Sequence, residues 1–270
     1  MTNTEQPPPA SGPGRPIALI TGVGRSIGIG AGIARRLAAT GWDIAFTYWT
    51  PYDRRMDWGA EPGAAASIEK ELAEAGARTA AIEADLTDPD AATRIFDEAE
   101  QSLGGPVTAL VLSHAESVDS GLLDTTVEAF DRHFAVNSRA SWLLIREYGL
   151  RFRSTPGTVP GTPTGRIVAL TSDHTVGNLP YGASKGALDR ITLAAAHELG
   201  HLGVTANVVN PGPVDTGWMN DELRETLARG TPLGRLGTPL DTAHLVGFLC
   251  SPEGQWVNGQ LLKSNGGAAA

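Results

Sequence analysis

The feature that most constrains the fold of this chain is a repeated alternation of short apolar runs with longer helical patterns. Apolar runs of this kind, bounded by glycine or polar residues, are typical of buried parallel strands. Strands that alternate with helices form a parallel sheet covered on both faces, and right-handed crossovers favour the doubly wound order. We predict seven strands, over Ile17–Thr21, Asp43–Tyr48, Thr79–Ala84, Thr108–Leu112, Arg166–Ser172, Thr205–Val209 and Gln260–Lys263.

Composition sets limits on the class of protein. Residues 16–270 are long enough for one α/β domain, and we interpret residues 1–15, which are rich in proline and glycine, as a disordered tail without the apolar stretch of a signal peptide. The single cysteine, Cys250, excludes an intrachain disulfide and favours a cytoplasmic protein. The net charge of −9 argues against nonspecific binding to nucleic acid or anionic membranes. No apolar run approaches the roughly 20 residues of a membrane span.

A glycine-rich turn follows the first predicted strand. Its glycines permit a tight turn, and the start of the next helix adds amide groups and the positive end of its dipole. This arrangement predicts a Rossmann-type site for a dinucleotide pyrophosphate, although a turn that binds nothing would show the same glycines. The predicted contacts are Gly22, Gly24, Arg25, Ser26, Ile27, Gly28 and Ile29.

The residues after the second strand bear on the choice of cofactor. Folds that prefer NAD place an acidic residue at the end of this strand, against the ribose 2′-hydroxyl. Here the strand ends with Tyr48, and the first carboxylate is Asp53, in an irregular aromatic-rich segment over Trp49–Gly63. Arg25, with Arg54 or Arg55, would supply positive charge to a 2′-phosphate. We therefore predict NADP(H) over NAD(H), with arginines that are merely solvated as the alternative.

A tyrosine and a lysine four residues apart form the candidate catalytic pair. Tyr181 and Lys185 share one face of a predicted helix over Tyr181–Leu199, and the chain holds three lysines in all. A nearby ammonium group favours the phenolate and lowers the tyrosine pKa from about 10, towards acid–base work at neutral pH. Ser172 ends the fifth predicted strand, at the carboxyl edge where such sheets bind ligands. Taken alone, the pair is equally compatible with a surface contact on a helix.

In conjunction, these residues resemble the short-chain dehydrogenase/reductase superfamily from Ile17 to Gly267, in the branch of 3-oxoacyl-carrier-protein reductases and natural-product ketoreductases. The resemblance implies that Tyr181 is the acid/base, that Ser172 orients the carbonyl, and that Lys185 binds the nicotinamide ribose and lowers the tyrosine pKa. It implies that Asn137 holds a water that relays protons to Lys185. The other motif residues that it assigns to the cofactor are Asp85, Leu86, Ser113, His114, Ala115, Pro211, Gly212, Val214 and Thr216.

Two departures from the family pattern stand out. Ser113-His114-Ala115-Glu116 replaces the usual Asn-Asn-Ala-Gly, which puts a carboxylate near the nicotinamide. The loop Asp173–Pro180 is about four residues shorter than is usual, so we expect an open or unusual substrate pocket. We predict that His174 and Trp218 line this pocket; exposure of the histidine or core packing of the tryptophan is the alternative.

The expected activity is reversible hydride transfer between NADP(H) and a ketone or secondary alcohol. A cofactor-binding protein without catalysis and an epimerase or dehydratase on the same fold are the alternatives. We expect a small-molecule carbonyl or alcohol substrate, no nucleic-acid or membrane partner, and a homo-oligomer (tetramer or dimer). His197 and His201 have the spacing of metal ligands but lack a third partner, so we predict no metal.

Overall fold

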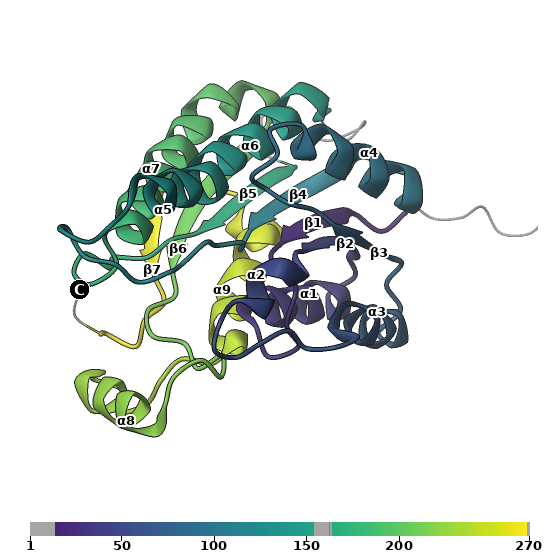
Figure 1. Cartoon of the computed structure of the whole chain (residues 1–270). Coiled ribbons are helices and arrows are strands. Elements are labelled where there is room, and N and C mark those ends of the chain that lie inside the picture. The colour runs from purple at the N-terminus through teal and green to yellow at the C-terminus, as the bar shows by residue number, and fades with distance from the viewer. Residues whose placement is uncertain (1–13, 154–161, 163, 269–270) are drawn as a thin grey trace, which may run out of the picture.

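The computed structural model describes residues 14–153, 162 and 164–268. Its centre is a parallel sheet of seven strands in the order β3-β2-β1-β4-β5-β6-β7 (Figure 1). The order reverses between β1 and β4, which confirms the predicted doubly wound α/β fold. The strands are β1 (Ile17–Thr21), β2 (Asp43–Tyr48), β3 (Thr79–Glu83), β4 (Val107–Leu112), β5 (Gly165–Leu170), β6 (Val204–Asn210) and β7 (Leu261–Lys263).

Helices cover both faces of the sheet because successive strand residues point to opposite sides. Leu19 belongs to the apolar core beneath α4, α6 and α7, and Ile20 to the core beneath α1, α3 and α9 (Figure 1). Both side chains are fully buried, as expected of a strand in the middle of a parallel sheet. The helices are α1 (Ile29–Ala39), α2 (Thr50–Arg54), α3 (Ala64–Glu74), α4 (Ala91–Leu103), α5 (Val127–His133), α6 (Ala140–Arg151), α7 (Leu179–Glu198), α8 (Asp221–Gly230) and α9 (Pro239–Cys250).

Several strand and helix ends lie one or two residues from the predicted ones, and four differences bear on the site or on the domain boundary. The fifth strand ends at Leu170, so Ser172 lies in the loop beyond it. A π-helical turn, Phe134–Arg139, separates α5 from α6. The segment predicted to be irregular contains α2, which starts with proline in its first turn.

The fourth difference concerns Arg15, which belongs to the folded domain rather than to the predicted tail. It donates hydrogen bonds to the carbonyls of Ala38 and Trp42 at 2.7 and 2.9 Å and forms an ion pair with buried Asp43. Residues 1–13 of that tail lie outside the described residues. Within the described part of the chain, none of the helices has the length and apolar character needed to span a bilayer.

Candidate active site

The glycine turn after β1 lies against the segment that follows β4. Gly22 has a φ of +76°, and a Cβ added there would lie 2.6 Å from the Cα of His114. A Cβ on Gly30 would lie 2.7 Å from the carbonyl oxygen of Gly22. Only glycine permits such close approaches, and they let α1 begin directly beneath the turn. The predicted tight turn at the β1/β4 switch point is therefore present.

One amide group of this turn binds a carboxylate of the chain itself. The backbone N–H of Ser26 donates to a carboxylate oxygen of Glu61 at 2.9 Å. Hydrogen bonds from the Ser26 amide and hydroxyl, with help from nearby Arg25 and Arg35, lower the pKa of the exposed Glu61 carboxyl. A donor set that binds a carboxylate also suits a phosphate oxygen, so the turn fits the predicted dinucleotide.

Arg25 connects the turn to the segment after β6. Its guanidinium donates to the carbonyl of Thr216 at 2.8 Å and stacks on the ring of Trp58, 4.9 Å from the ring centroid. The structure thus brings together Arg25 and Thr216, two predicted cofactor contacts that are far apart in the sequence.

The structure corrects the expectation that no carboxylate lies near the end of β2. Helix α2 carries Asp53 back to the turn, where a Cβ on Gly24 would lie 3.0 Å from its carboxylate. The other carboxylate oxygen accepts a hydrogen bond from Trp58 at 2.9 Å. Burial raises the pKa of Asp53, while Trp58 and Arg25 oppose that shift. Asp53 lies five residues beyond Tyr48 in the sequence, so its position beside the turn was not predicted.

His114 replaces the second asparagine of the family pattern and points into the protein. Its Nδ1 lies 2.6 Å from the Thr21 hydroxyl and its Nε2 lies 3.0 Å from the carbonyl of Val136. Burial lowers its pKa to about 3, so the imidazole is neutral, with Nε2–H donating and Nδ1 accepting. The residue is 7% exposed. Cofactor contacts of this residue would therefore use its backbone.

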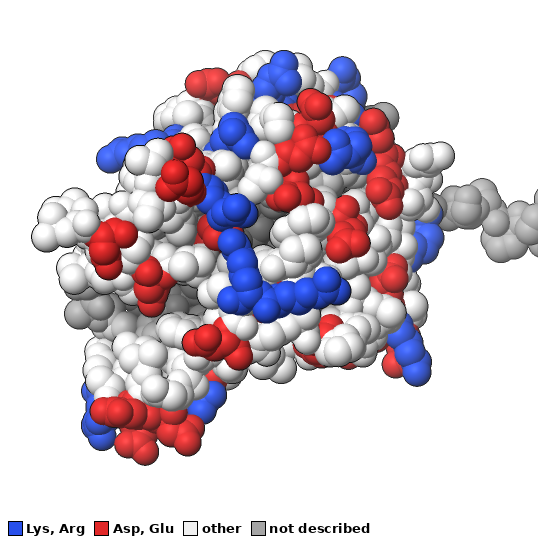
Figure 2. Space-filling view, viewed as in Figure 1, with Lys and Arg blue, Asp and Glu red and all other residues white. Residues whose placement is uncertain are grey.

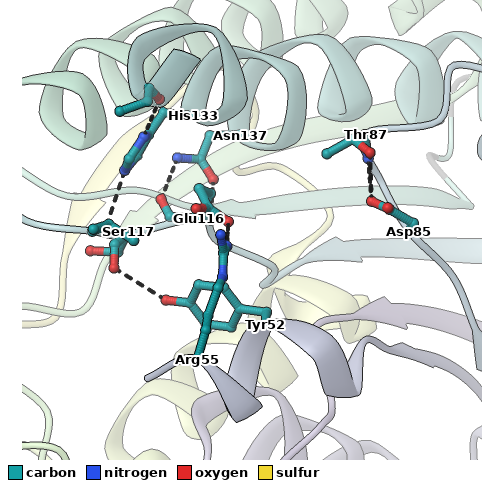
Figure 3. Close-up of polar contacts among 10 residues, drawn as sticks. Tyr52, Arg55, Asp85, Thr87, Glu116, Ser117, His133 and Asn137 are labelled. Carbon is teal, nitrogen blue, oxygen red and sulfur yellow. Dashed lines mark hydrogen bonds and ion pairs between the residues drawn. The ribbon is translucent and has the colours of Figure 1, made fainter. Parts of the chain in front are cut away.

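Asn137 is buried in the π-helical turn and is fully engaged with protein groups. Its Oδ1 accepts from the backbone N–H of Glu116 at 2.8 Å, and its Nδ2 donates to the Glu116 carbonyl at 2.8 Å (Figure 3). Its Nδ2 also donates to the Ser184 hydroxyl at 2.9 Å. The side chain has no exposed surface, and its hydrogen bonds position the segment after β4. The implied water relay stays a prediction.

The predicted catalytic residues meet at the carboxyl edge of the sheet. Tyr181 and Lys185 occupy successive turns of α7, and the Ser172 side chain hydrogen-bonds that of Tyr181. The Lys185 ammonium donates to the carbonyls of His114 and Leu170 at 3.2 and 3.0 Å, and lies 5.8 Å from the centre of the Tyr181 ring. This geometry brings an acid, a hydroxyl donor and an ammonium group into one small site.

The pKa of Tyr181 differs from the expectation. Burial raises the pKa of Tyr181 to about 12, against the lowering effect of the Ser172 hydrogen bond. Burial also lowers the pKa of Lys185 to about 8. Lys185 does not lower the pKa of Tyr181 as expected, because its ammonium group donates to two carbonyls rather than to the phenol oxygen. In this structure the tyrosine is therefore a proton donor at neutral pH.

The short loop before α7 is held at both ends. The backbone N–H of His174 donates to the Ser172 hydroxyl at 3.1 Å, and its ring meets the Tyr181 ring edge-on with centroids 6.5 Å apart. Asn178 donates to Ser117 at 3.0 Å and to Asp119 at 2.6 Å. His174 therefore lies beside the candidate acid, but it is exposed, as in the alternative given for it, and its role in a substrate pocket stays a prediction. Trp218, the other predicted pocket residue, is half exposed.

The remaining predicted cofactor residues also follow strand ends. The Asp85 carboxylate accepts from the Thr87 amide and hydroxyl, both at 2.8 Å (Figure 3), and Leu86 is buried. Asn210 at the end of β6 accepts from the amide of Gly212 at 2.9 Å. Ser113, Ala115, Pro211 and Val214 lie in the segments directly after β4 and β6. All these segments therefore begin at the carboxyl edge of the sheet, where the candidate catalytic residues also lie.

Several contacts that hold the loops at the carboxyl edge of the sheet were not predicted from the sequence. His133 on α5 accepts from the amide of Val118 at 3.1 Å and donates to the carbonyl of Ala129 at 2.7 Å (Figure 3). Glu61 accepts from the Ser26 amide of the turn. Arg55, predicted as a possible cation for the 2′-phosphate, forms an ion pair with Glu116, and this pairing was not predicted. Basic side chains lie over the region of α2 in the centre of the face shown in Figure 2, with acidic side chains around them. No local sequence signal marks these pairings.

Comparison with known proteins places the chain in a family. A family model described as enoyl-(acyl carrier protein) reductase matches residues 22–269. An uncharacterised oxidoreductase of Bacillus subtilis is 38% identical, over 93% of this chain and 96% of that protein. An NADPH-dependent aldehyde reductase-like protein of Arabidopsis thaliana is 36% identical, over 96% of each.

Solved structures agree with these relatives. A blue fluorescent protein from a metagenomic library, in complex with NADPH, superimposes with a TM-score of 0.82 and 34% identity, over 95% of this chain and 99% of that one. Sequence, fold and site agree, and the chain belongs to the short-chain dehydrogenase/reductase family.

Proposed function

We propose that this NAD(P)-dependent oxidoreductase uses NADP(H) to interconvert ketones and secondary alcohols, with Tyr181 as the general acid and base. The observation that carries the proposal is the meeting of Tyr181, Ser172 and Lys185 at the carboxyl edge, beside a turn whose Ser26 amide binds a carboxylate. Hydrogen-bonded groups in this arrangement suit proton transfer to an oxygen atom that becomes negatively charged during reduction.

Each residue has a distinct task in the proposed reaction. When bound, the reduced nicotinamide supplies a hydride to the carbonyl carbon. Tyr181 donates its phenolic proton to the carbonyl oxygen, and the Ser172 hydroxyl orients that oxygen. Lys185 connects the end of β5 to the segment after β4 through the carbonyls of Leu170 and His114, and this keeps the nicotinamide side of the edge in place.

The test is a panel of aldehydes and ketones, with consumption of NADPH or NADH followed by the absorbance of the reduced nicotinamide. We expect substrate-dependent consumption with at least one class of carbonyl compound. Isomerised or dehydrated product without net consumption would instead support an epimerase or dehydratase. Cofactor binding without turnover of any carbonyl or alcohol would favour the non-catalytic alternative, for which Glu116 and the short loop are the motivation.

The preference for NADP(H) rests on Arg25 and on proteins named as NADPH-dependent or solved with NADPH. Arg25 is partly exposed beside the turn, and its charge would have to offset the nearby Asp53 and Glu61 carboxylates for a 2′-phosphate to bind. We expect Arg25→Met to weaken NADPH binding about ten-fold and NADH binding by less than about two-fold, because charge-assisted bonds contribute about 1.5–3 kcal/mol. Titration of both cofactors measures this, and an equal loss for both would contradict it.

The proposal of a homo-oligomer (tetramer or dimer) is supported by an apolar surface on the helices that carry Asn137 and Tyr181. Trp142 is 49% exposed there, beside a hollow of about 500 Å³. Contiguous exposed apolar surface marks association sites. Light scattering of the purified protein tests this, and a monomer at micromolar concentration would overturn it.

We also infer a cytoplasmic location, because the lone thiol of Cys250 is buried and free.

A further inference from the structure

The feature that goes beyond the family pattern is an ion pair that crosses the ligand-binding edge of the sheet. Arg55 directly follows α2, on the β2 side, and Glu116 follows β4. Because β1 lies between β2 and β4, the contact spans two strand spacings, about 10 Å, across the end of β1 where the glycine turn starts. A bound dinucleotide occupies this same crevice.

Glu116 is the fixed half of the pair. Asn137 holds both its backbone N–H and its carbonyl at 2.8 Å (Figure 3). The Glu116 side chain is 5% exposed. Arg55 is the more accessible half, at 38% exposed, and its guanidinium lies over the Tyr52 ring, 5.1 Å from the centroid. The Tyr52 hydroxyl points to the carbonyl of Ser117 at 3.4 Å, so a second contact from α2 reaches the same segment.

One oxygen of Glu116 has no partner. Arg55 binds Oε2, whereas Oε1 is buried and has no hydrogen-bond donor among the described residues. A buried carboxylate oxygen left without a donor costs free energy, so its retention at a ligand-binding edge indicates a donor that the ligand brings. The ribose hydroxyls of a dinucleotide are such donors, and its pyrophosphate requires that a nearby carboxylate be neutralised.

The position of Glu116 favours the nicotinamide half of the cofactor. It lies two residues beyond His114, whose carbonyl accepts from Lys185, and its backbone is held by the side chain that also bonds Ser184. The adenosine half belongs to the other side of β1, near Tyr48 and Asp85 at the ends of β2 and β3.

We propose that Glu116 is a cofactor-binding residue whose free carboxylate oxygen accepts a hydrogen bond from a hydroxyl of the nicotinamide ribose, while Arg55 neutralises the other oxygen. The inference rests on the proposed use of a nicotinamide dinucleotide. It assigns Arg55 to Glu116 rather than to the 2′-phosphate, and it explains why this chain carries a glutamate after β4 and a cation after β2.

The experiment measures dissociation constants for NADPH and for 2′,5′-ADP, which lacks the nicotinamide half. Glu116→Met is expected to weaken NADPH binding about ten-fold or more and to leave 2′,5′-ADP unchanged, since it removes a hydrogen bond to a charged acceptor. Arg55→Met is expected to weaken NADPH binding more than Glu116→Met does, because it leaves the Glu116 carboxylate without a neutralising charge beside the pyrophosphate. The double variant is expected to bind NADPH as Glu116→Met does, since no buried charge remains.

The matched control is Arg78→Met, which breaks a similar pair between a half-exposed arginine and buried Asp43 at the opposite edge of the sheet. It is expected to leave both constants unchanged, and urea unfolding of every variant checks that the fold is intact. Unchanged NADPH affinity in Glu116→Met, or an equal loss for 2′,5′-ADP, would overturn the assignment while leaving the proposed function in place. A wild-type protein that binds 2′,5′-ADP but not NADPH would overturn both.

Discussion

Replacing Tyr181 with phenylalanine is expected to reduce carbonyl reduction by about 10²- to 10⁴-fold, the usual contribution of a positioned general acid. The substitution removes only the phenol oxygen and its hydrogen bond with Ser172, and it keeps the ring that meets His174 edge-on. The dissociation constant for NADPH should therefore change by less than about two-fold. Steady-state rates and cofactor titration on the same preparation give both numbers. Turnover close to that of the wild type would exclude Tyr181 as the acid.

The direction of the reaction should respond to pH through the same residue. Because burial raises the pKa of Tyr181 to about 12, the phenol is protonated over the whole neutral range and is ready to donate. Reduction should then be nearly independent of pH between about 6 and 8 as far as this group is concerned, whereas alcohol oxidation, which needs the phenolate, should rise about ten-fold per pH unit. An oxidation rate that levels off near neutral pH would show that the bound cofactor lowers the tyrosine pKa.

The fold was predictable because short stretches of sequence are enough to identify its strands and its glycine turn. Buried parallel strands are apolar runs, so Ile17–Thr21 and Asp43–Tyr48 were located to the residue, and the glycine turn marked the start of α1. Short polar segments were harder. Nothing in the sequence of Thr50–Arg54 separates a single helical turn from a loop, and so α2 was missed.

Contacts between distant segments were not predictable from one sequence. Arg55 and Glu116 are 61 positions apart, and Ser26 and Glu61 are 35 apart, so no periodicity connects them. The same limit affected the tyrosine pKa. The spacing of Tyr181 and Lys185 places both on one face of α7, but the direction of the ammonium group depends on carbonyls supplied by β5 and by the segment after β4. Residue types and order identified the site, whereas charges and hydrogen bonds within it required the three-dimensional arrangement.

Lys185→Met is expected to remove a pH-dependent part of the free energy of unfolding. Burial lowers the pKa of Lys185 to about 8 in the folded protein, whereas an unfolded lysine titrates near about 10.4. Between these values the unfolded chain binds more protons than the folded protein does, so this residue makes stability rise with pH. From about pH 7 to about pH 9.5 the wild type should gain about 2 kcal/mol relative to the variant.

The comparison of the two proteins is needed because other buried groups act in the opposite sense. Burial raises the pKa values of Tyr181 and Cys250 to about 12 each, so the unfolded chain loses those protons first and stability falls as pH rises through this range. Both groups are present in the variant, and the carbonyls of His114 and Leu170 that lose a donor do not titrate. The difference between the two urea-unfolding curves, measured at several pH values, therefore isolates Lys185. Parallel pH dependences would show that this ammonium group titrates normally in the folded protein and that its burial does not shift its pKa.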